Sequence, residues 1–142
     1  EMKELIAADS NICRNYKLLT SIKGVGPITA IVMLCSTLNF TKITDHRKFA
    51  CYCGLAPFEH SSGTSVRGGC HTSSMANRDI KVQLNRSALI AIRCDPQLKA
   101  YYERKVAEGK HKFSVLNAVR AKIAARCFAV VRRGTPYVAL QI

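Results

Sequence analysis

A helix, a tight glycine turn and a second helix are predicted by the stretch Leu19-Thr20-Ser21-Ile22-Lys23-Gly24-Val25-Gly26-Pro27-Ile28-Thr29-Ala30. Gly24 and Gly26 flank one apolar residue, and glycine accepts positive φ and lets another surface approach its backbone closely. Pro27 suits the first position of the second helix, because its φ is preset and its missing N–H is not needed there. The N–H groups that open this helix then point outward, where an anion can bind them. We expect this hairpin to occupy about residues 17–38.

The charge of the chain indicates which anion that is. Among 142 residues, 22 Lys and Arg face 9 Asp and Glu, which gives a formal charge of +13 and a pI near 9.8. This balance is unlike a typical metabolic enzyme and favours a partner with dense negative charge, namely DNA. The hairpin resembles a helix-hairpin-helix, a motif that binds the DNA backbone. The candidate DNA-binding residues are Lys23, Gly24, Val25, Gly26, Thr29, Arg67, Arg78 and Lys81.

The rest of the chain is predicted to be helical. Apolar spacing predicts one helix over residues 1–16, as the end of a linker or coiled coil, and a helical domain over 17–142. Residues 54–76 show no period and are expected to form a long irregular loop between helices. Strand signals are nearly absent, so the fold class is all-α, a compact multi-helix domain. The other expected helices run from Thr44 or Asp45 to Tyr52 before Gly54, from an Asn77 N-cap to Cys94, from Asp95-Pro96 to Gly109, and from about Lys112 to Arg133 before Gly134.

The cysteines do not form a disulfide framework, because there are seven of them at irregular spacing. We expect a reducing, cytoplasmic setting without a membrane span, with Cys35, Cys94 and Cys127 on apolar helix faces. The spacing of Cys51 and Cys53 does not suit a zinc knuckle, although some potential ligands lie nearby. Those are His60, Cys70 and His71. The nine carboxylates are scattered, so no metal site is expected in this chain.

Four motifs in fixed order carry a family resemblance that covers roughly residues 16–105. They are Ile22-Lys23-Gly24-Val25-Gly26-Pro27, then Phe49-Ala50-Cys51-Tyr52-Cys53-Gly54-Leu55-Ala56-Pro57, then His60-Ser61-Ser62-Gly63 with Arg67-Gly68, then Asn77 at the opening of a helix. This pattern resembles the C-terminal transposase domain of the insertion sequence 110 family (110/116/902 group). These bacterial transposases are described as bridge-RNA-guided serine recombinases.

The resemblance implies a mechanism shared with parts outside this chain. A ribonuclease-H-like N-terminal domain supplies four carboxylates that bind Mg²⁺, and a coiled coil links it to the helical domain. A serine before a glycine attacks DNA and becomes covalently joined to it, which implies Ser62 as the nucleophile, with Ser61 as the alternative. A structured guide RNA pairs with donor and target DNA, and dimers or tetramers share composite sites. This chain by itself would bind no cofactor and would be inactive.

Elementary chemistry is consistent with this assignment. Phosphoryl transfer to a hydroxyl needs a reachable nucleophile, a proton acceptor and cations around the phosphate. Ser62 beside Gly63 supplies the first, His60 is a candidate for the second, and Arg67, Arg78 or Lys81 can supply the third.

Two other interpretations of the sequence are open: a non-catalytic helix-hairpin-helix module, and a domain for guide-RNA binding or assembly. Tyr101 and Tyr102 beside Arg104 suit either core packing, a tyrosine nucleophile or base stacking. The last helix carries a basic set that suits either a nucleic-acid backbone or solvent. This set is Arg120, Lys122, Arg126, Arg132 and Arg133.

Overall fold

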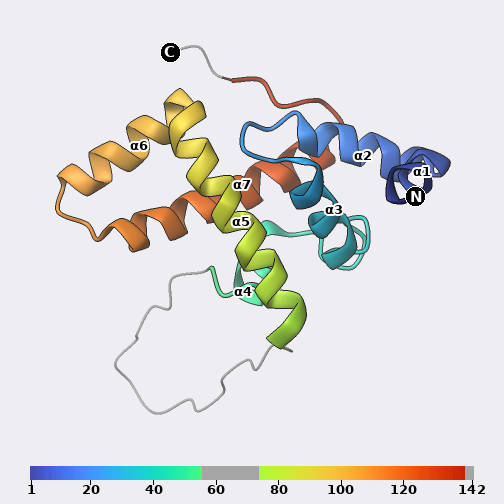
Figure 1. Cartoon of the computed structure of the whole chain (residues 1–142), viewed down its shortest axis with the longest axis horizontal. Helices are drawn as coiled ribbons and strands as arrows, with labels where there is room; N and C mark the ends of the chain where they lie inside the picture. Colours follow the sequence, from blue (N-terminus) through green and yellow to red (C-terminus); the bar gives the residue numbers. More distant parts are fainter. Residues whose placement is uncertain (56–73, 140–142) are drawn as a thin grey trace.

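The computed structural model describes residues 1–55 and 74–139, with side chains for 1–55 and 78–139. This part of the chain forms helices and contains no strand, which confirms the predicted all-α class (Figure 1). The helices are α1 (Met2–Ala8), α2 (Ser10–Thr20), α3 (Pro27–Ser36), α4 (His46–Tyr52), α5 (Ser74–Cys94), α6 (Pro96–Ala107) and α7 (Lys112–Arg133). None of these helices is both long enough and apolar enough to cross a membrane.

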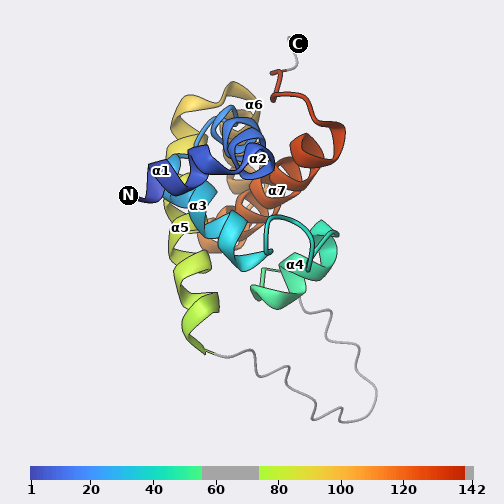
Figure 2. The same ribbon diagram turned by 90° about the vertical axis from the view of Figure 1, so that its right-hand side faces the viewer.

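The two long helices, α5 and α7, cross at the centre and organise the others (Figure 1). The α2–α3 pair packs on one side, with α3 against α5 and α2 against α7, while α6 packs against both long helices on the other side. Helix α4 lies against α7 (Figure 2). The core between them is apolar and fully buried, so burial of these side chains is the main stabilising term. Its largest members include Leu19, Ile22, Met33, Phe49, Leu55, Ile80, Leu84, Leu98 and Ile123.

The single helix expected over residues 1–16 is wrong, because Asp9 divides it. Asp9 adopts an extended conformation (φ −109°, ψ 119°). Its carboxylate accepts hydrogen bonds from the N–H groups of Asn11 at 2.9 Å and Ile12 at 3.1 Å. An aspartate in this position caps a new helix by satisfying otherwise unpaired N–H groups. The capping preference of Asp9 therefore outweighs the apolar period that runs through it.

Other helix boundaries follow the local signals. Asp45 rather than Thr44 caps α4, and Gly54 ends it with φ +67°. Gly134 ends α7 in the left-handed conformation (φ 68°, ψ 20°), as its position predicted. The expected Asn77 cap is wrong, because α5 already begins at Ser74 and Asn77 lies inside it. Helix α6 ends at Ala107, slightly before Gly109.

An unpredicted left-handed turn follows α3. Three consecutive non-glycine residues have positive φ: Leu38 (48°), Asn39 (56°) and Phe40 (61°). Such backbone conformations cost energy and persist only when the surroundings hold them. Here the Thr37 hydroxyl donates to the Met33 carbonyl oxygen at 2.7 Å and accepts from the Phe40 N–H at 2.9 Å. The Phe40 ring packs edge-on against Phe128 at 4.9 Å between centroids. A buried aromatic contact thus offsets the strain.

The thiols divide into two groups, contrary to the sequence expectation. Cys53 and Cys127 are buried, and burial raises the pKa of each to about 12. Cys127 therefore behaves as the small core residue that was predicted. Cys35 and Cys94 are exposed, so they are not small buried residues as expected, although Cys35 does lie on an apolar face with Ile31 and Leu34.

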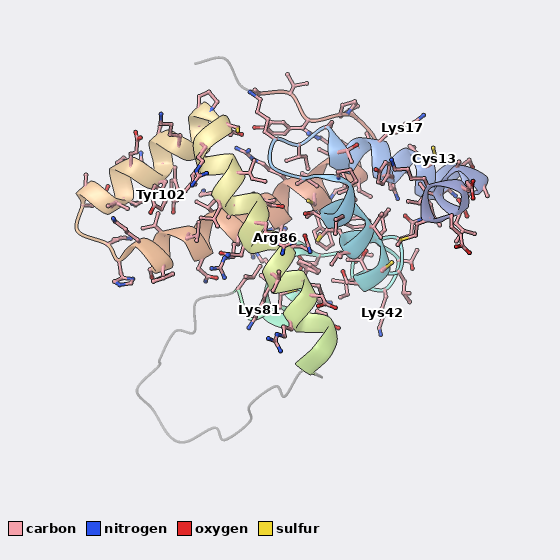
Figure 3. All side chains as sticks on the ribbon, viewed as in Figure 1. Cys13, Lys17, Lys42, Lys81, Arg86 and Tyr102 are labelled. Carbon is pink, nitrogen blue, oxygen red and sulfur yellow. The ribbon has the colours of Figure 1, made fainter. Side chains whose placement is uncertain are left out.

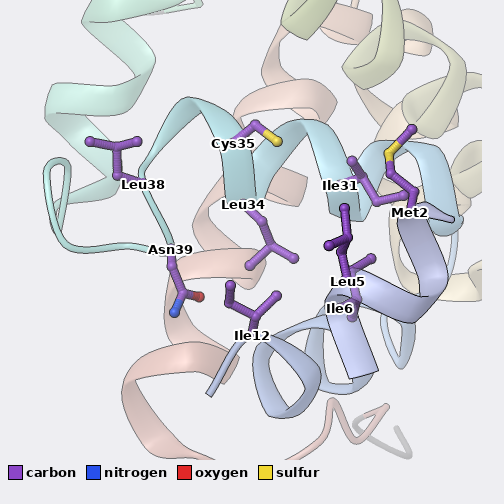
Figure 4. A pocket seen from close by; sticks show the side chains of 9 residues that line it. All are labelled: Met2, Leu5, Ile6, Ile12, Ile31, Leu34, Cys35, Leu38 and Asn39. Carbon is purple, nitrogen blue, oxygen red and sulfur yellow. The ribbon is translucent and has the colours of Figure 1, made fainter. Parts of the chain in front are cut away.

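An apolar pocket of about 450 Å³ lies between α1, α2 and α3. Figure 4 shows Leu5, Ile6, Ile12 and Leu34 grouped around it. No residue of α1 is buried, so the short first helix covers this pocket only in part. Its lining is almost entirely apolar, with Asn39 as its polar side chain.

Asp95 joins α6 to α7 through two kinds of hydrogen bond. Its carboxylate caps α6 by accepting from the N–H groups of Gln97 at 2.9 Å and Leu98 at 3.2 Å. The second carboxylate oxygen accepts from Arg126 Nη1 at 2.7 Å. Burial alone would raise the pKa of Asp95, but the Arg126 hydrogen bond and charge and the two backbone donors outweigh it and hold the pKa below its ordinary value. The charged form is therefore the one that the fold stabilises.

Asp95→Asn is expected to lower the free energy of unfolding by about 2 kcal/mol at pH 7, because a buried charge-assisted hydrogen bond is lost while the cap is kept. A carboxyl whose pKa is lowered by folding stabilises the protein above its unfolded pKa, and that contribution disappears as the pH falls through the folded pKa. The difference in unfolding free energy between wild type and variant should therefore shrink below about pH 4. Urea unfolding at pH 7 and at pH 3 measures this difference.

The matched control is Asp9→Asn. Asp9 caps α2 through two N–H groups in the same way, but it is exposed. We expect a change well below 1 kcal/mol for this variant. Equal losses in the two variants would show that capping, not the Arg126 pair, accounts for the Asp95 effect.

Candidate functional site

The glycine hairpin forms as two packed helices with a tight turn, but part of it faces inward. Gly24 has φ +92°, and a Cβ atom there would lie 2.7 Å from the Ser87 carbonyl oxygen and 3.1 Å from Ala91 Cβ. The close approach that the sequence predicted at Gly24 is therefore made by α5 of the same chain. Gly24 fixes how the hairpin sits on α5, a role that the sequence alone did not reveal.

The side chains of two predicted DNA-binding residues are buried. Val25 is 5% exposed and Thr29 is 5% exposed, and the Thr29 and Ser87 hydroxyls are hydrogen-bonded at 3.1 Å. Their side chains cannot reach a ligand in this arrangement, because Val25 is buried in the core and Thr29 is hydrogen-bonded to α5. At these two positions, only main-chain groups could therefore contact DNA.

The outward part of the hairpin is formed by Lys23, Gly26 and the start of α3. Lys23 is exposed, and a Cβ at Gly26 would have no neighbour within 4 Å. The N-terminus of α3 has Pro27 in its first turn, and among the described residues no side chain caps it. Uncapped N–H groups at a helix N-terminus, with its partial positive charge, suit an anion.

The nucleophile candidates lie outside the described residues. Ser61, Ser62 and Arg67 belong to residues 56–73, which we call the serine segment, as does His60. The structure describes the residues that flank this segment, Leu55 before it and the start of α5 after it. We call Gly54 and Leu55, where the chain enters the serine segment, its root.

The root is held by buried contacts. Leu55 is 1% exposed, its N–H donates to the Ala50 carbonyl oxygen at 2.8 Å, and its carbonyl oxygen accepts from Asn117 Nδ2 at 3.1 Å. Asn117 belongs to α7, so the long helix fixes the point where the serine segment begins. Sequence reasoning missed Asn117, and a lone asparagine within a helix carries no signal that would have revealed it.

Two of the predicted cations lie together near this root. A Cβ at Gly54 would lie 3.1 Å from Lys81 Nζ, so the ammonium group sits against the Gly54 backbone. Arg78 is exposed on α5, three residues before Lys81, and residues so spaced lie on adjacent positions of one helix surface. Figure 3 shows Lys81 on the part of α5 beside α4, with Arg86 farther along the helix. The root therefore carries positive charge.

The hairpin and the root are connected through α5. Gly24 packs on Ser87, and Lys81 precedes Ser87 by six residues, which is about 9 Å along a helix axis. The predicted DNA-binding residues that the structure describes thus form two groups, one in the hairpin that packs against α5 and one on α5 itself. Their positions relative to each other are fixed by α5, not by the connecting chain.

The basic set of α7 is not one surface. Arg126 is engaged by Asp95, and Lys122 Nζ lies 4.5 Å from the centre of the Tyr101 ring. Arg120 is half-buried, and burial lowers the pKa of its guanidinium. Arg132 and Arg133 are exposed at the end of the helix. The set is therefore divided: Lys122, Arg126 and Arg133 line one hollow beside α6, whereas Arg120 and Arg132 do not line it.

Among the residues that the structure describes, the tyrosines and cysteines show no arrangement for chemistry of their own. Tyr101 and Tyr102 are both half-buried, and Tyr101 packs against the core. Cys51 is exposed while Cys53 is buried, so the two thiols face different surroundings. Within residues 1–55 and 78–139, no three His, Cys, Asp or Glu residues gather where they could hold a metal ion.

Comparison with known proteins gives this geometry a family. The sequence profile of the Transposase IS116/IS110/IS902 family matches residues 16–103, which include the hairpin, α4, the serine segment, α5 and most of α6. The chain belongs to this transposase family. The resemblance deduced from four short motifs is thereby confirmed.

Curated relatives of this transposase-family chain come from several bacteria. An insertion element IS110 protein of Streptomyces coelicolor is 39% identical over 121 residues, which cover 84% of this chain and 29% of the relative. The pilin gene-inverting protein of Moraxella bovis is 24% identical, covering 94% of this chain and 42% of the relative. An IS900 protein of Mycobacterium paratuberculosis is 30% identical, and the match covers 78% of this chain and 28% of the relative. The chain therefore spans less than half the length of these relatives.

Proposed function

We propose that this transposase-family domain carries the nucleophile and part of the DNA-binding surface of a longer insertion-sequence transposase. The observation that carries the proposal is the continuous family match over residues 16–103, because it includes the hairpin, Ser62 and the cationic helix α5. The name of the Moraxella relative, a pilin gene-inverting protein, supports a reaction that cuts and rejoins DNA.

The proposed reaction is attack of the Ser62 hydroxyl oxygen on a DNA phosphorus atom. A serine–phosphate ester forms while the bond from phosphorus to the departing strand oxygen breaks, and His60 is the candidate acceptor of the serine proton. Cations near the phosphate stabilise the charge that develops on its oxygens. Lys81 against Gly54 and exposed Arg78 support this role at the root, and Arg67 is the candidate within the serine segment.

The hairpin is proposed to hold the DNA backbone during this reaction. Lys23 and the open N-terminus of α3, with Gly26 beside it, are the groups that can reach a phosphate. Because these groups do not distinguish one base from another, the hairpin would position DNA without reading its sequence.

Other parts of the reaction are proposed for the remainder of the longer protein. The described residues do not fit a Mg²⁺ site, since they bring no three suitable ligands together. We therefore assign the expected Mg²⁺ ion to carboxylates outside this chain and route no step of this domain through it. A structured guide RNA and a dimeric or tetrameric assembly are the proposed partners.

The test is to locate the covalent bond between protein and DNA. Full-length transposase is reacted with its DNA, denatured and digested with trypsin, and the DNA-linked peptide is identified by mass spectrometry. We expect the peptide Phe49–Arg67, which contains Ser61 and Ser62, because trypsin cleaves after Lys48 and Arg67. Linkage to Ala100–Arg104 would instead identify Tyr101 or Tyr102 and refute the serine assignment. Cleavage without any linked peptide would favour a non-catalytic DNA-binding module.

A further inference from the structure

A second charged surface lies beside the hairpin turn. It is a groove of about 1090 Å³ between the turn, α6, α7 and the segment after α7. A smaller hollow continues it along α7 and shares Gln97, Tyr101, Lys122 and Tyr137 with it. The polar and aromatic residues that line the two hollows include Lys23, Asp95, Tyr101, Arg104, Lys122, Arg126, Arg133 and Tyr137.

The lining is strongly positive. Five of these residues are Lys or Arg, and the single carboxylate is Asp95. Asp95 is 3% exposed and is paired with Arg126 at 2.7 Å, so these two charges cancel and the other four cations carry the positive charge of the lining. The ion pair of Arg104 with exposed Glu108 is long, at 4.0 Å. The groove is therefore complementary to a polyanion.

Aromatic rings hold several of these cations in place. The Tyr101 ring lies 4.5 Å from Lys122 Nζ and 5.8 Å from the Arg104 guanidinium carbon. The Tyr137 ring lies 4.7 Å from the Arg126 guanidinium carbon. Cation–π contacts restrict long basic side chains that would otherwise be mobile. Arg104, Lys122 and Arg126 are thus restrained along the groove before any ligand binds.

The wall formed by the last segment is fixed as well. The Tyr137 N–H donates to the Ser21 hydroxyl at 2.9 Å, which joins residues 116 positions apart in sequence. Ser21 belongs to the hairpin turn, so the groove and the hairpin form one continuous surface. Lys23 contributes to both.

We propose that this groove binds single-stranded nucleic acid. Grooves that combine a row of cations with aromatic side chains are typical of proteins that bind a single strand along its backbone. The volume slightly exceeds that of pockets for drug-sized ligands, so it suits a few nucleotides of one strand. A duplex presents a wide convex surface and would contact only the groove rim. The site would thus hold a strand beside the hairpin, and it does not depend on the role of Ser62.

The test compares two double variants of the chain that lose the same charge from the same two helices. Arg104→Ala/Lys122→Ala removes cations that line the groove, and the control Lys99→Ala/Lys112→Ala removes exposed cations outside it. Binding of fluorescent oligothymidylate, oligouridylate and duplex DNA is titrated over a range of salt concentrations. Circular dichroism establishes that both variants are folded.

The groove variant should bind single strands roughly tenfold more weakly near physiological salt, with a salt slope smaller by about 1.4, since each lost phosphate contact removes about 0.7. The control should change single-strand binding by less than about threefold. Preference for oligouridylate or oligothymidylate would distinguish RNA from DNA as the strand, and either result supports the site. Equal losses in both variants, or an equal loss of duplex binding, would overturn it.

Discussion

Ser62→Ala in the full-length transposase is expected to abolish the covalent protein–DNA adduct and to lower strand cleavage by about 10⁴-fold or more. A methyl group cannot attack phosphorus, and removal of a nucleophile typically costs this much because the other groups of the site act only together with it. Cleavage is measured on labelled DNA, and the adduct is measured as DNA retained by denatured protein. DNA binding should be nearly unchanged, since phosphate contacts are assigned to the hairpin and to α5.

The matched control is Ser61→Ala, which alters the neighbouring residue in the same segment. It should retain both adduct and cleavage within about tenfold, because a neighbouring serine can help to position the site without forming the bond. The reverse pattern would make Ser61 the nucleophile. An adduct that survives both substitutions would contradict a serine mechanism altogether.

Gly24→Ala is expected to lower the free energy of unfolding by about 3 kcal/mol. One cause is the strain of a Cβ atom on a left-handed backbone, and the other is the repacking that this atom forces on its neighbours. At Gly24 the φ is +92°, and the new Cβ would lie 2.7 Å from a backbone oxygen of α5. A backbone atom in a central helix cannot move aside as the end of a flexible side chain can. For a chain of this size we expect the melting temperature to fall by roughly 10 °C.

Gly26→Ala is the control, two residues along the same turn. Its φ is −89° and a Cβ would meet nothing within 4 Å, so we expect a change below about 1 kcal/mol. Thermal and urea unfolding of both variants measure the difference. Similar stability of the two variants would contradict the packing of Gly24 against α5.

Local signals in the sequence predicted much of this protein. Asp95-Pro96 and Gly134 mark the helix ends that the structure shows, because capping depends on a few adjacent atoms. The order of the glycine hairpin, the Gly54 motif and Ser62-Gly63 was enough to recognise the family that the profile confirms. The local signals failed at two positions. At Asp9 a helix cap interrupts an apolar period, and at Asn77 the predicted cap lies inside α5, which begins at Ser74.

The surfaces of the molecule, by contrast, depend on contacts between distant residues. The sequence by itself determined the helices, the family and the excess positive charge, since these follow from residue types and short spacings. Only the tertiary structure decided which residues face outward. Helix α5 packs on Gly24 and Thr29, whereas Lys23 stays exposed. Arg126 forms an ion pair with Asp95 and so differs from the other basic residues of α7. The physical reason is that close packing and ion pairing join residues far apart in sequence, and no local pattern encodes the partner.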